Sequence, residues 1–275
     1  MENITAIHNS LTKQLEKYTK LIIQEYHSYI PKETLQKIKS IEDFSSIIKI
    51  EDYGNINAYA TSTNIFIPLS ATVVFKTLKK YPGYGINKKH KTINKNKDIV
   101  NNNTFTTYIY HVFVSGTTLE GYYEDLLLHE TMHFCGGDGA SVLKEGLNEL
   151  LTRILAKKYN LRTNYCGYPK EVKLCAKLME RYGKETIYQL AFMKDFSLEL
   201  NFIEEKHGHE LAELYFKITR LTNDEFFEKY YNHMKSFNGI KGVFLKAKLY
   251  SKLKYKAAYK VLEEYINKQA KTHTK

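Results

Sequence analysis

The chain has 275 residues, of which 43% are hydrophobic, and carries a formal net charge of +11 at neutral pH. This apolar content excludes a disordered chain and suffices for one large domain or two smaller ones, each with its own core. No apolar run approaches the length of a membrane span, and the polar start does not resemble a secretion signal. We therefore expect a globular, cytoplasmic protein with no membrane partner, and export without a signal peptide stays open.

The positive charge is concentrated in two segments. Lys76 to Asp98 contains eight lysines and one aspartate, and Lys241 to Lys275 contains ten lysines and two glutamates. Lysine is the usual solubilising residue, whereas arginine, which clamps phosphate better, is scarce. The composition therefore predicts solvated segments and disfavours nucleic-acid binding.

The first part of the chain predicts two helices followed by strands. Apolar residues at three-to-four spacing predict the helices, and short runs rich in isoleucine, threonine and tyrosine predict the strands, the second and third of which form a hairpin. The helices are expected at Asn3–Ser28 and Pro31–Ile38, and the strands at Ile47–Ile50, Asn57–Ala60 and Asn64–Ile67. Beyond them we expect a helix at Ala71–Lys80, an exposed loop at Ile86–Asn103 and a strand at Thr104–Ser115.

The sequence HETMH occupies residues 129–133, within a segment from Glu120 to Cys135 whose apolar residues surround the helical wheel. Such a segment predicts a buried helix. Two histidines four residues apart share one helix face, so His129 and His133 can both reach one metal ion, while Glu130 lies at the rim of that face. Buried ionisable groups are costly without a partner, and a metal supplies one. The spacing suits zinc.

A second helix is predicted from Val142 to about Tyr159. Its apolar stripe lies opposite a polar face, which taken alone would be exposed to solvent. However, two zinc histidines need a third protein ligand, with water in the fourth position of a catalytic site. A glutamate of this helix is well placed to supply it, and Glu149 could accept the free imidazole N–H of a ligand histidine. The polar face carries Glu145, Glu149, Thr152 and Arg153.

HETMH at 129–133 and KEGLNEL at 144–150 together resemble the gluzincin class of zinc metallopeptidases. In that class HExxH is followed by a second helix with a glutamate ligand. The resemblance implies that Glu145 is the third ligand of one Zn²⁺ ion and that Glu149 is the acid that supports the site. The chain differs from the class at Lys144, where asparagine is common, and in its eleven-residue link between His133 and Glu145.

A competing resemblance is to the metzincins, whose motif continues as HExxHxxGxxH with histidine or aspartate last. Gly136 matches the glycine, but Gly139 stands at the ligand position and Asp138 lies one residue early. The candidates for the third ligand are therefore, in order, Glu145, Glu149 and Asp138.

A zinc ion at this site would polarise the scissile carbonyl and activate water, with Glu130 as general base. The oxyanion that develops needs a second electrophile, commonly a tyrosine or histidine. The candidates are Tyr165, Tyr168, His207 and His209. An extended peptide substrate could add to a sheet edge, provided either by Thr107–Ser115 or by the hairpin around Asn57–Ile67.

The sequence predicts an α+β, zincin-like fold. Residues 1–135 are expected to form a mixed lobe with a small twisted sheet and the HExxH helix, and residues 136–275 a mostly helical lobe with the third ligand, the two making one catalytic unit. The helices of this second lobe are expected at Pro169–Tyr182, Lys184–Met193, Leu198–Leu221, Asp224–Phe237 and Val243 to about Lys268.

The predicted function is that of a zinc-dependent metallopeptidase with a peptide or protein substrate. One alternative is an inactive, metal-stabilised binding or regulatory module whose lysine-rich surfaces contact an acidic partner or nucleic acid. Its binding would weaken steeply with added salt, unlike peptide hydrolysis. Another is a zinc hydrolase of a non-peptide amide. Substrate preference, endo- or exopeptidase action and oligomeric state stay open.

Overall fold

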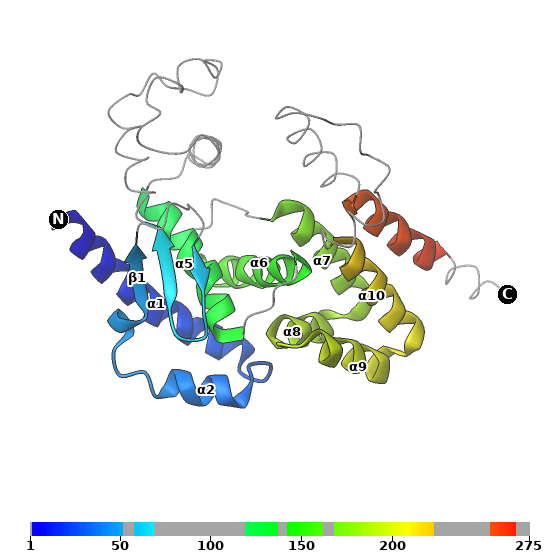
Figure 1. The fold of residues 1–275 in the computed structure, drawn as a ribbon, viewed down its shortest axis with the longest axis horizontal. Coiled ribbons are helices and arrows are strands. Elements are labelled where there is room, and N and C mark those ends of the chain that lie inside the picture. The colour runs from blue at the N-terminus through cyan, green and yellow to red at the C-terminus, as the bar shows by residue number, and fades with distance from the viewer. Residues whose placement is uncertain are drawn as a thin grey trace, which may run out of the picture. The chain divides into compact units, whose positions relative to one another are not determined.

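The computed structural model describes residues 2–51, 58–68, 119–136, 142–161, 168–222 and 254–267. These residues form many helices and a three-stranded mixed sheet, so the predicted α+β class is confirmed (Figure 1). The chain divides into two compact units, Met1–Asp138 with Leu151–Gly167, and Gly139–Leu150 with Tyr168–Lys275. The division falls within helix α6 (Val142–Lys158).

The first unit begins with helix α1 (Glu2–Tyr26), whose apolar residues recur every three or four positions. Leu15 and Ile22 on that stripe are fully buried, as the predicted amphipathic helix requires. At its C-terminal end, the buried Tyr26 hydroxyl donates a hydrogen bond to the carbonyl of Leu151 at 3.2 Å. The elements that precede the sheet are α1 (Glu2–Tyr26), α2 (Lys32–Lys39) and the 3₁₀ helix η1 (Phe44–Ser46).

The sheet has the order β1-β3-β2. Strand β3 (Ile65–Pro68) runs parallel to β1 (Ile48–Glu51) and antiparallel to β2 (Tyr59–Ala60). Ile65 and Ile67 are fully buried and Phe66 between them is half-buried, which is the alternation of a strand with one face in a core. The predicted hairpin between the last two strands is confirmed.

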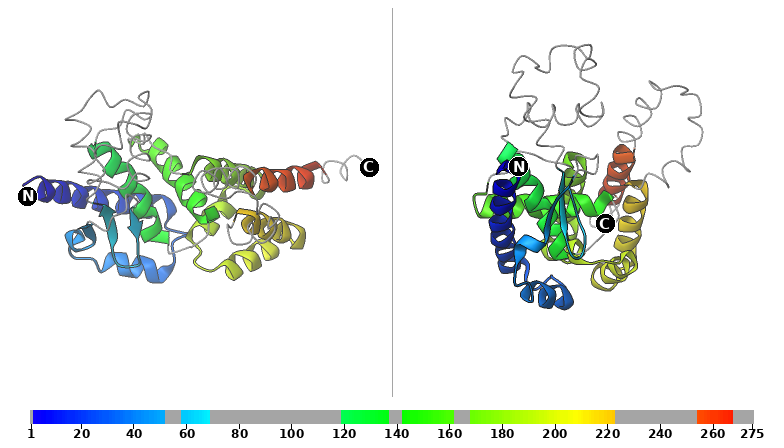
Figure 2. Two further views of the ribbon diagram at one scale, coloured as in Figure 1. Left: turned by 45° about the horizontal axis from the view of Figure 1, so that its top comes forward. Right: turned by 60° about the vertical axis from the view of Figure 1, so that its left-hand side comes forward.

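Helix α5 (Leu119–Gly136) carries the HExxH motif. It lies alongside α1 and contacts strands β3 and β2, as Figures 1 and 2 show. The side chains buried from residue 123 onward include large apolar residues on every side of the helix, so the predicted buried helix is confirmed. They include Tyr123, Leu127, Leu128, Met132, Phe134 and Cys135.

The second unit is helical in its described part. Besides the start of α6, it contains α7 (Pro169–Tyr182), α8 (Lys184–Phe192), α9 (Phe196–His207), α10 (His209–Thr222) and a helix over residues 254–267. The prediction of one continuous helix from Leu198 to Leu221 is wrong, because Gly208 has φ +88° and ends α9. A positive φ cannot continue a right-handed helix, and glycine adopts it without strain.

Some predicted elements lie outside the described residues. These are the helix at Ala71–Lys80, the loop at Ile86–Asn103, the strand at Thr104–Ser115 and the helix at Asp224–Phe237. Within the described ranges, no helix is both long and apolar enough to cross a membrane.

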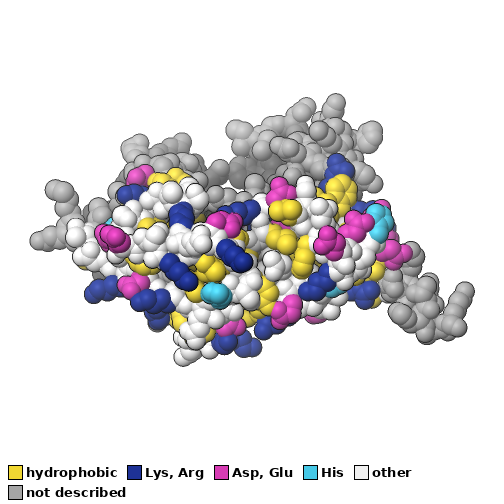
Figure 3. Space-filling model, turned by 90° about the horizontal axis from the view of Figure 1, so that it is seen from below, with side chains coloured by type: hydrophobic (Ala, Val, Ile, Leu, Met, Phe, Trp, Pro, Cys, Tyr) yellow, Lys and Arg dark blue, Asp and Glu magenta, His cyan; other side chains and the backbone are white. Residues whose placement is uncertain are grey.

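Charged side chains of both signs are interspersed on the face drawn in Figure 3. Lysine and arginine side chains alternate there with aspartate and glutamate among uncharged residues. Mixed charge of this kind is typical of a solvated surface.

Candidate metal centre

Helix α5 places two histidines on the same side, one turn apart. His129 and His133 are each 8% exposed, and their Nε2 atoms face each other at 3.1 Å. The rings meet edge to face, with their planes at 67°. Because the Nε2 atoms converge, both histidines would bind a shared metal ion through Nε2, which leaves Nδ1 as the protonated ring nitrogen.

The third member of the cluster comes from the first turn of α6. Glu145 is half-buried, and the ligand atoms of His129, His133 and Glu145 all lie within 4.8 Å of one another. Among the described residues, this is the group of histidine, cysteine and acidic side chains that could hold a metal ion. The structure thus brings together the three residues that the sequence nominated.

The donor set and its spacing fit zinc. Two nitrogens that each bind zinc at about 2.0–2.1 Å in a tetrahedral arrangement lie about 3.3 Å apart. The 3.1 Å between the two Nε2 atoms is close to that separation. Two imidazoles and one carboxylate also match the protein ligands of catalytic zinc sites, which keep a fourth position for water or substrate.

The helix termini favour a cation and its carboxylate ligand at these positions. His133 lies in the last turn of α5, where unpaired carbonyl groups give the helix end a partial negative charge. Glu145 lies in the first turn of α6, where the partial positive charge stabilises an ionised carboxylate. Both effects act in the direction that metal binding requires.

Glu130 is 6% exposed and lies between the two histidines in sequence, on a turn of α5 that is buried throughout. The next residue, Thr131, satisfies its hydroxyl locally by donating to the carbonyl of Leu127 at 2.5 Å. Glu130 is therefore buried on the same helix as the two histidines.

The other nominated residues have varied positions. Glu149 is 5% exposed on α6, and Tyr168 immediately precedes α7 and is half-buried. His207 Nε2 is hydrogen-bonded to Thr186 Oγ1 at 2.7 Å, and the exposed His209 pairs with Glu204 at 2.9 Å, so both histidines have local partners. Asp138 and Tyr165 lie outside the described residues.

The predicted polar face of α6 is less exposed than expected, because Glu149 and Thr152 are buried and Glu145 and Arg153 are half-buried. The expected apolar stripe is present in Leu143, Leu147 and Leu151, but polar residues between these positions are equally inaccessible. A helix with buried polar groups on several sides requires partners for each of them. The buried polar residues are Lys144, Asn148, Glu149 and Thr152.

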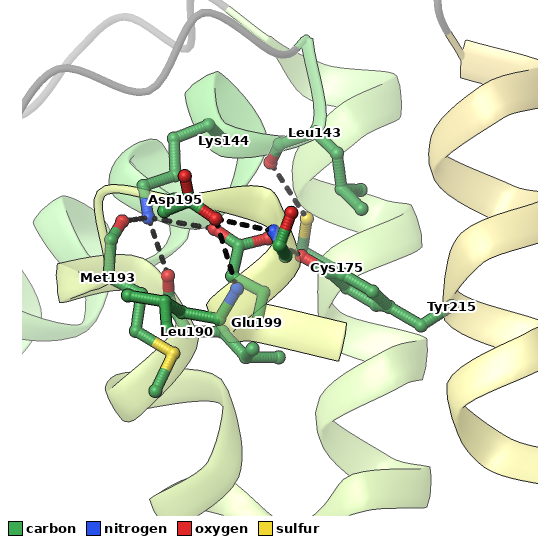
Figure 4. Close-up of polar contacts among 10 residues, drawn as sticks. Leu143, Lys144, Cys175, Leu190, Met193, Asp195, Glu199 and Tyr215 are labelled. Atoms are coloured by element: carbon green, nitrogen blue, oxygen red, sulfur yellow. Dashed lines mark hydrogen bonds and ion pairs between the residues drawn. The ribbon is translucent and has the colours of Figure 1, made fainter. Parts of the chain in front are cut away.

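Lys144 has a complete set of partners, which sequence reasoning did not assign (Figure 4). Its ammonium donates to the carbonyls of Leu190, at 2.6 Å, and Met193, and to Glu199 Oε1 at 3.3 Å. Glu199 Oε2 accepts a hydrogen bond from the Tyr215 hydroxyl at 2.7 Å. Burial lowers the pKa of Lys144, and the neighbouring Glu199 carboxylate opposes that shift.

Gly146 lets α6 approach α7 closely. A Cβ at this position would lie 2.7 Å from Glu171 Cβ and 3.0 Å from Cys175 Sγ, which is shorter than side chains tolerate. Cys175 also makes a weak hydrogen bond to the carbonyl of Leu143 at 3.7 Å. The glycine after Glu145 therefore has a packing role, and burial raises the pKa of the Cys175 thiol beside it.

Comparisons with known proteins assign no family. No protein-family model, no curated protein and no solved structure matches the chain. The cluster of two histidines and a glutamate is accordingly the basis for any assignment of function.

Proposed function

We propose that this protein is a zinc-dependent metallopeptidase of the gluzincin type with a zincin-like fold. The observation that carries the proposal is the convergence of His129, His133 and Glu145 within 4.8 Å. In this proposal the three side chains bind one Zn²⁺ ion, and Glu149, buried one turn after Glu145, supports the site.

Zinc would supply a Lewis acid and lower the pKa of a bound water to about 7. Glu130 would accept the proton of the attacking water on its carboxylate and later deliver it to the leaving amine. Tyr168, half-buried immediately before α7, is a candidate for stabilising the oxyanion in this proposal.

The edge of the sheet suits an extended peptide. Within the described chain, β3 is paired on both sides, whereas β1 and β2 are each paired with β3 alone. Strand β2 also contacts α5, the helix that carries the motif. We therefore assign peptide binding to the β2 edge by strand addition. The alternative edge, Thr107–Ser115, lies outside the described residues.

The test compares the wild type with Glu130→Gln. Both proteins are expected to contain one equivalent of zinc by metal analysis, because Glu130 is not a ligand. Cleavage of a peptide library by the variant should fall by roughly 10²–10⁴-fold, the usual contribution of a general base. His133→Ala serves as the matched control that should lose the metal as well as the activity.

Each contrary result has a separate meaning. A wild type without zinc, or a variant that cleaves as fast as the wild type, would contradict the enzyme. Zinc bound without peptide cleavage would favour a metal-stabilised binding module, and cleavage confined to small amides would favour a non-peptide substrate.

A further inference from the structure

We propose that Lys144 is a positioning residue for Glu145, acting through the ion pair that it forms with Glu199. The inference rests on the proposed metal site and adds to it the contacts that hold the third ligand, Glu145, in place. Lys144 and Glu145 are consecutive in the first turns of α6, so whatever immobilises one backbone position immobilises the other.

The environment of Lys144 provides acceptors for a charged ammonium group. An ammonium group has three N–H donors, and all three find acceptors in Leu190, Met193 and Glu199. Only 2% of the Lys144 side chain and 8% of the Glu199 side chain are exposed. Because all three donors are paired in a buried environment, Lys144 holds the first turn of α6 in one position relative to the residues that it contacts.

The residues that Lys144 contacts lie where α8 ends and α9 begins. Leu190 belongs to the last turn of α8 and Met193 is its C-cap, so the ammonium covers carbonyl groups that the helix leaves unpaired. Glu199 lies in the first turn of α9, where a negative charge is favourable. Both helix dipoles therefore strengthen the anchorage, whose hydrogen bonds and ion pair are drawn in Figure 4.

The geometry separates Lys144 from the metal cluster itself. Adjacent residues on a helix point about 100° apart, so the Lys144 side chain does not share the direction of the Glu145 carboxylate. Its influence on the metal therefore passes through the backbone of α6. Gly146, on the other side of Glu145, allows the close contact with α7 and completes the clamp on this turn.

The experiment replaces the ion pair with neutral side chains of similar size in Lys144→Met/Glu199→Gln. The glutamine retains an oxygen for the Tyr215 hydroxyl, and the methionine retains the length of the lysine stem, so no lone charge stays buried. Circular dichroism and thermal melts establish that the variant is folded. Zinc affinity is then measured by competition with a chromophoric chelator, and the visible spectrum of the Co²⁺-substituted protein reports the ligand geometry.

Zinc affinity should fall by roughly 10- to 100-fold, the cost commonly seen when groups that orient a ligand are lost. The Co²⁺ spectrum should change as well. The matched control is Lys158→Met/Glu25→Gln, which removes an ion pair at the other end of the same helix and should leave affinity and spectrum unchanged.

A folded Lys144→Met/Glu199→Gln protein with the affinity and Co²⁺ spectrum of the wild type would overturn the positioning role and leave the proposed function intact. A wild type that binds zinc but cleaves no peptide would remove the peptidase and leave the positioning role standing. A wild type that binds no zinc would remove both.

Discussion

Helices α5 and α6 are both buried over most of their described length, for opposite reasons. From Tyr123 onward, α5 is buried because it carries large apolar side chains on every side, with the motif as its main polar group. Helix α6 is buried although Lys144, Asn148 and Glu149 interrupt its apolar stripe. Burial by apolar content can be read from a local segment, whereas burial of polar groups depends on partners supplied by other helices.

The largest expected effect comes from removing one member of the buried pair of α6. Lys144→Met leaves the Glu199 carboxylate buried and without its cation, which should lower the free energy of unfolding by about 3–5 kcal/mol. Urea denaturation followed by circular dichroism measures the change.

The two ends of α6 provide the control for this prediction. Lys158 is 53% exposed, so Lys158→Met, which breaks its ion pair with Glu25, should cost no more than about 1 kcal/mol. If the two single variants lost stability equally, the contrast between a buried and a solvated charge on this helix would be wrong.

The part of the site that lies on α5 could be predicted because its information is local. Histidines four residues apart on a helix must share a face, and the apolar residues around them predict burial, so α5 was expected within one residue of its observed bounds at each end. Glu145 was reached by resemblance rather than by geometry, because sequence alone does not define the path of the eleven residues that separate it from His133.

The anchorage of α6 could not be predicted, because its partners are distant in the sequence. Leu190 and Glu199 are 46 and 55 residues from Lys144, and nothing in the neighbourhood of the lysine indicates them. The only local signal of this anchorage is Lys144 itself, which stands where the gluzincins often have asparagine. The break between α9 and α10 is a different case, since Gly208 is visible in the sequence but its positive φ is set by the fold.

A smaller effect is expected at Gly146, which tests the contact of α6 with α7. Gly146→Ala would place a methyl group 2.7 Å from Glu171 Cβ, so the helices must separate slightly. Overpacking should lower the free energy of unfolding by about 1–3 kcal/mol, against a gain in helix propensity of up to about 1 kcal/mol. Thermal melts give the net change.

Lys157→Ala is the control for Gly146→Ala, because Lys157 is exposed on the same helix and its replacement should be nearly neutral. A stabilised Gly146→Ala protein would show that the first turns of α6 have room to move. It would weaken the view that α6 is clamped there, while the burial of α5 would be unaffected.

The smallest effect concerns His207, which is hydrogen-bonded to Thr186 and, within the described ranges, has no ion pair like that of Lys144 with Glu199. Burial and the neighbouring Lys206 lower the pKa of His207 below its usual 6.5. Between that lowered pKa and 6.5 the unfolded chain binds more protons than the folded one, so stability falls with falling pH in this window and is fully retained above it.

Metal-free wild type and His207→Gln should therefore be melted at about pH 8 and about pH 5.5, which bracket the ordinary histidine pKa. On acidification, the melting temperature of the wild type should fall slightly more than that of the variant, because glutamine has no proton to gain. Thr186 can keep a hydrogen bond to either side chain, so the difference isolates the charge. If the two proteins lost the same amount, the lowered pKa of His207 would be contradicted.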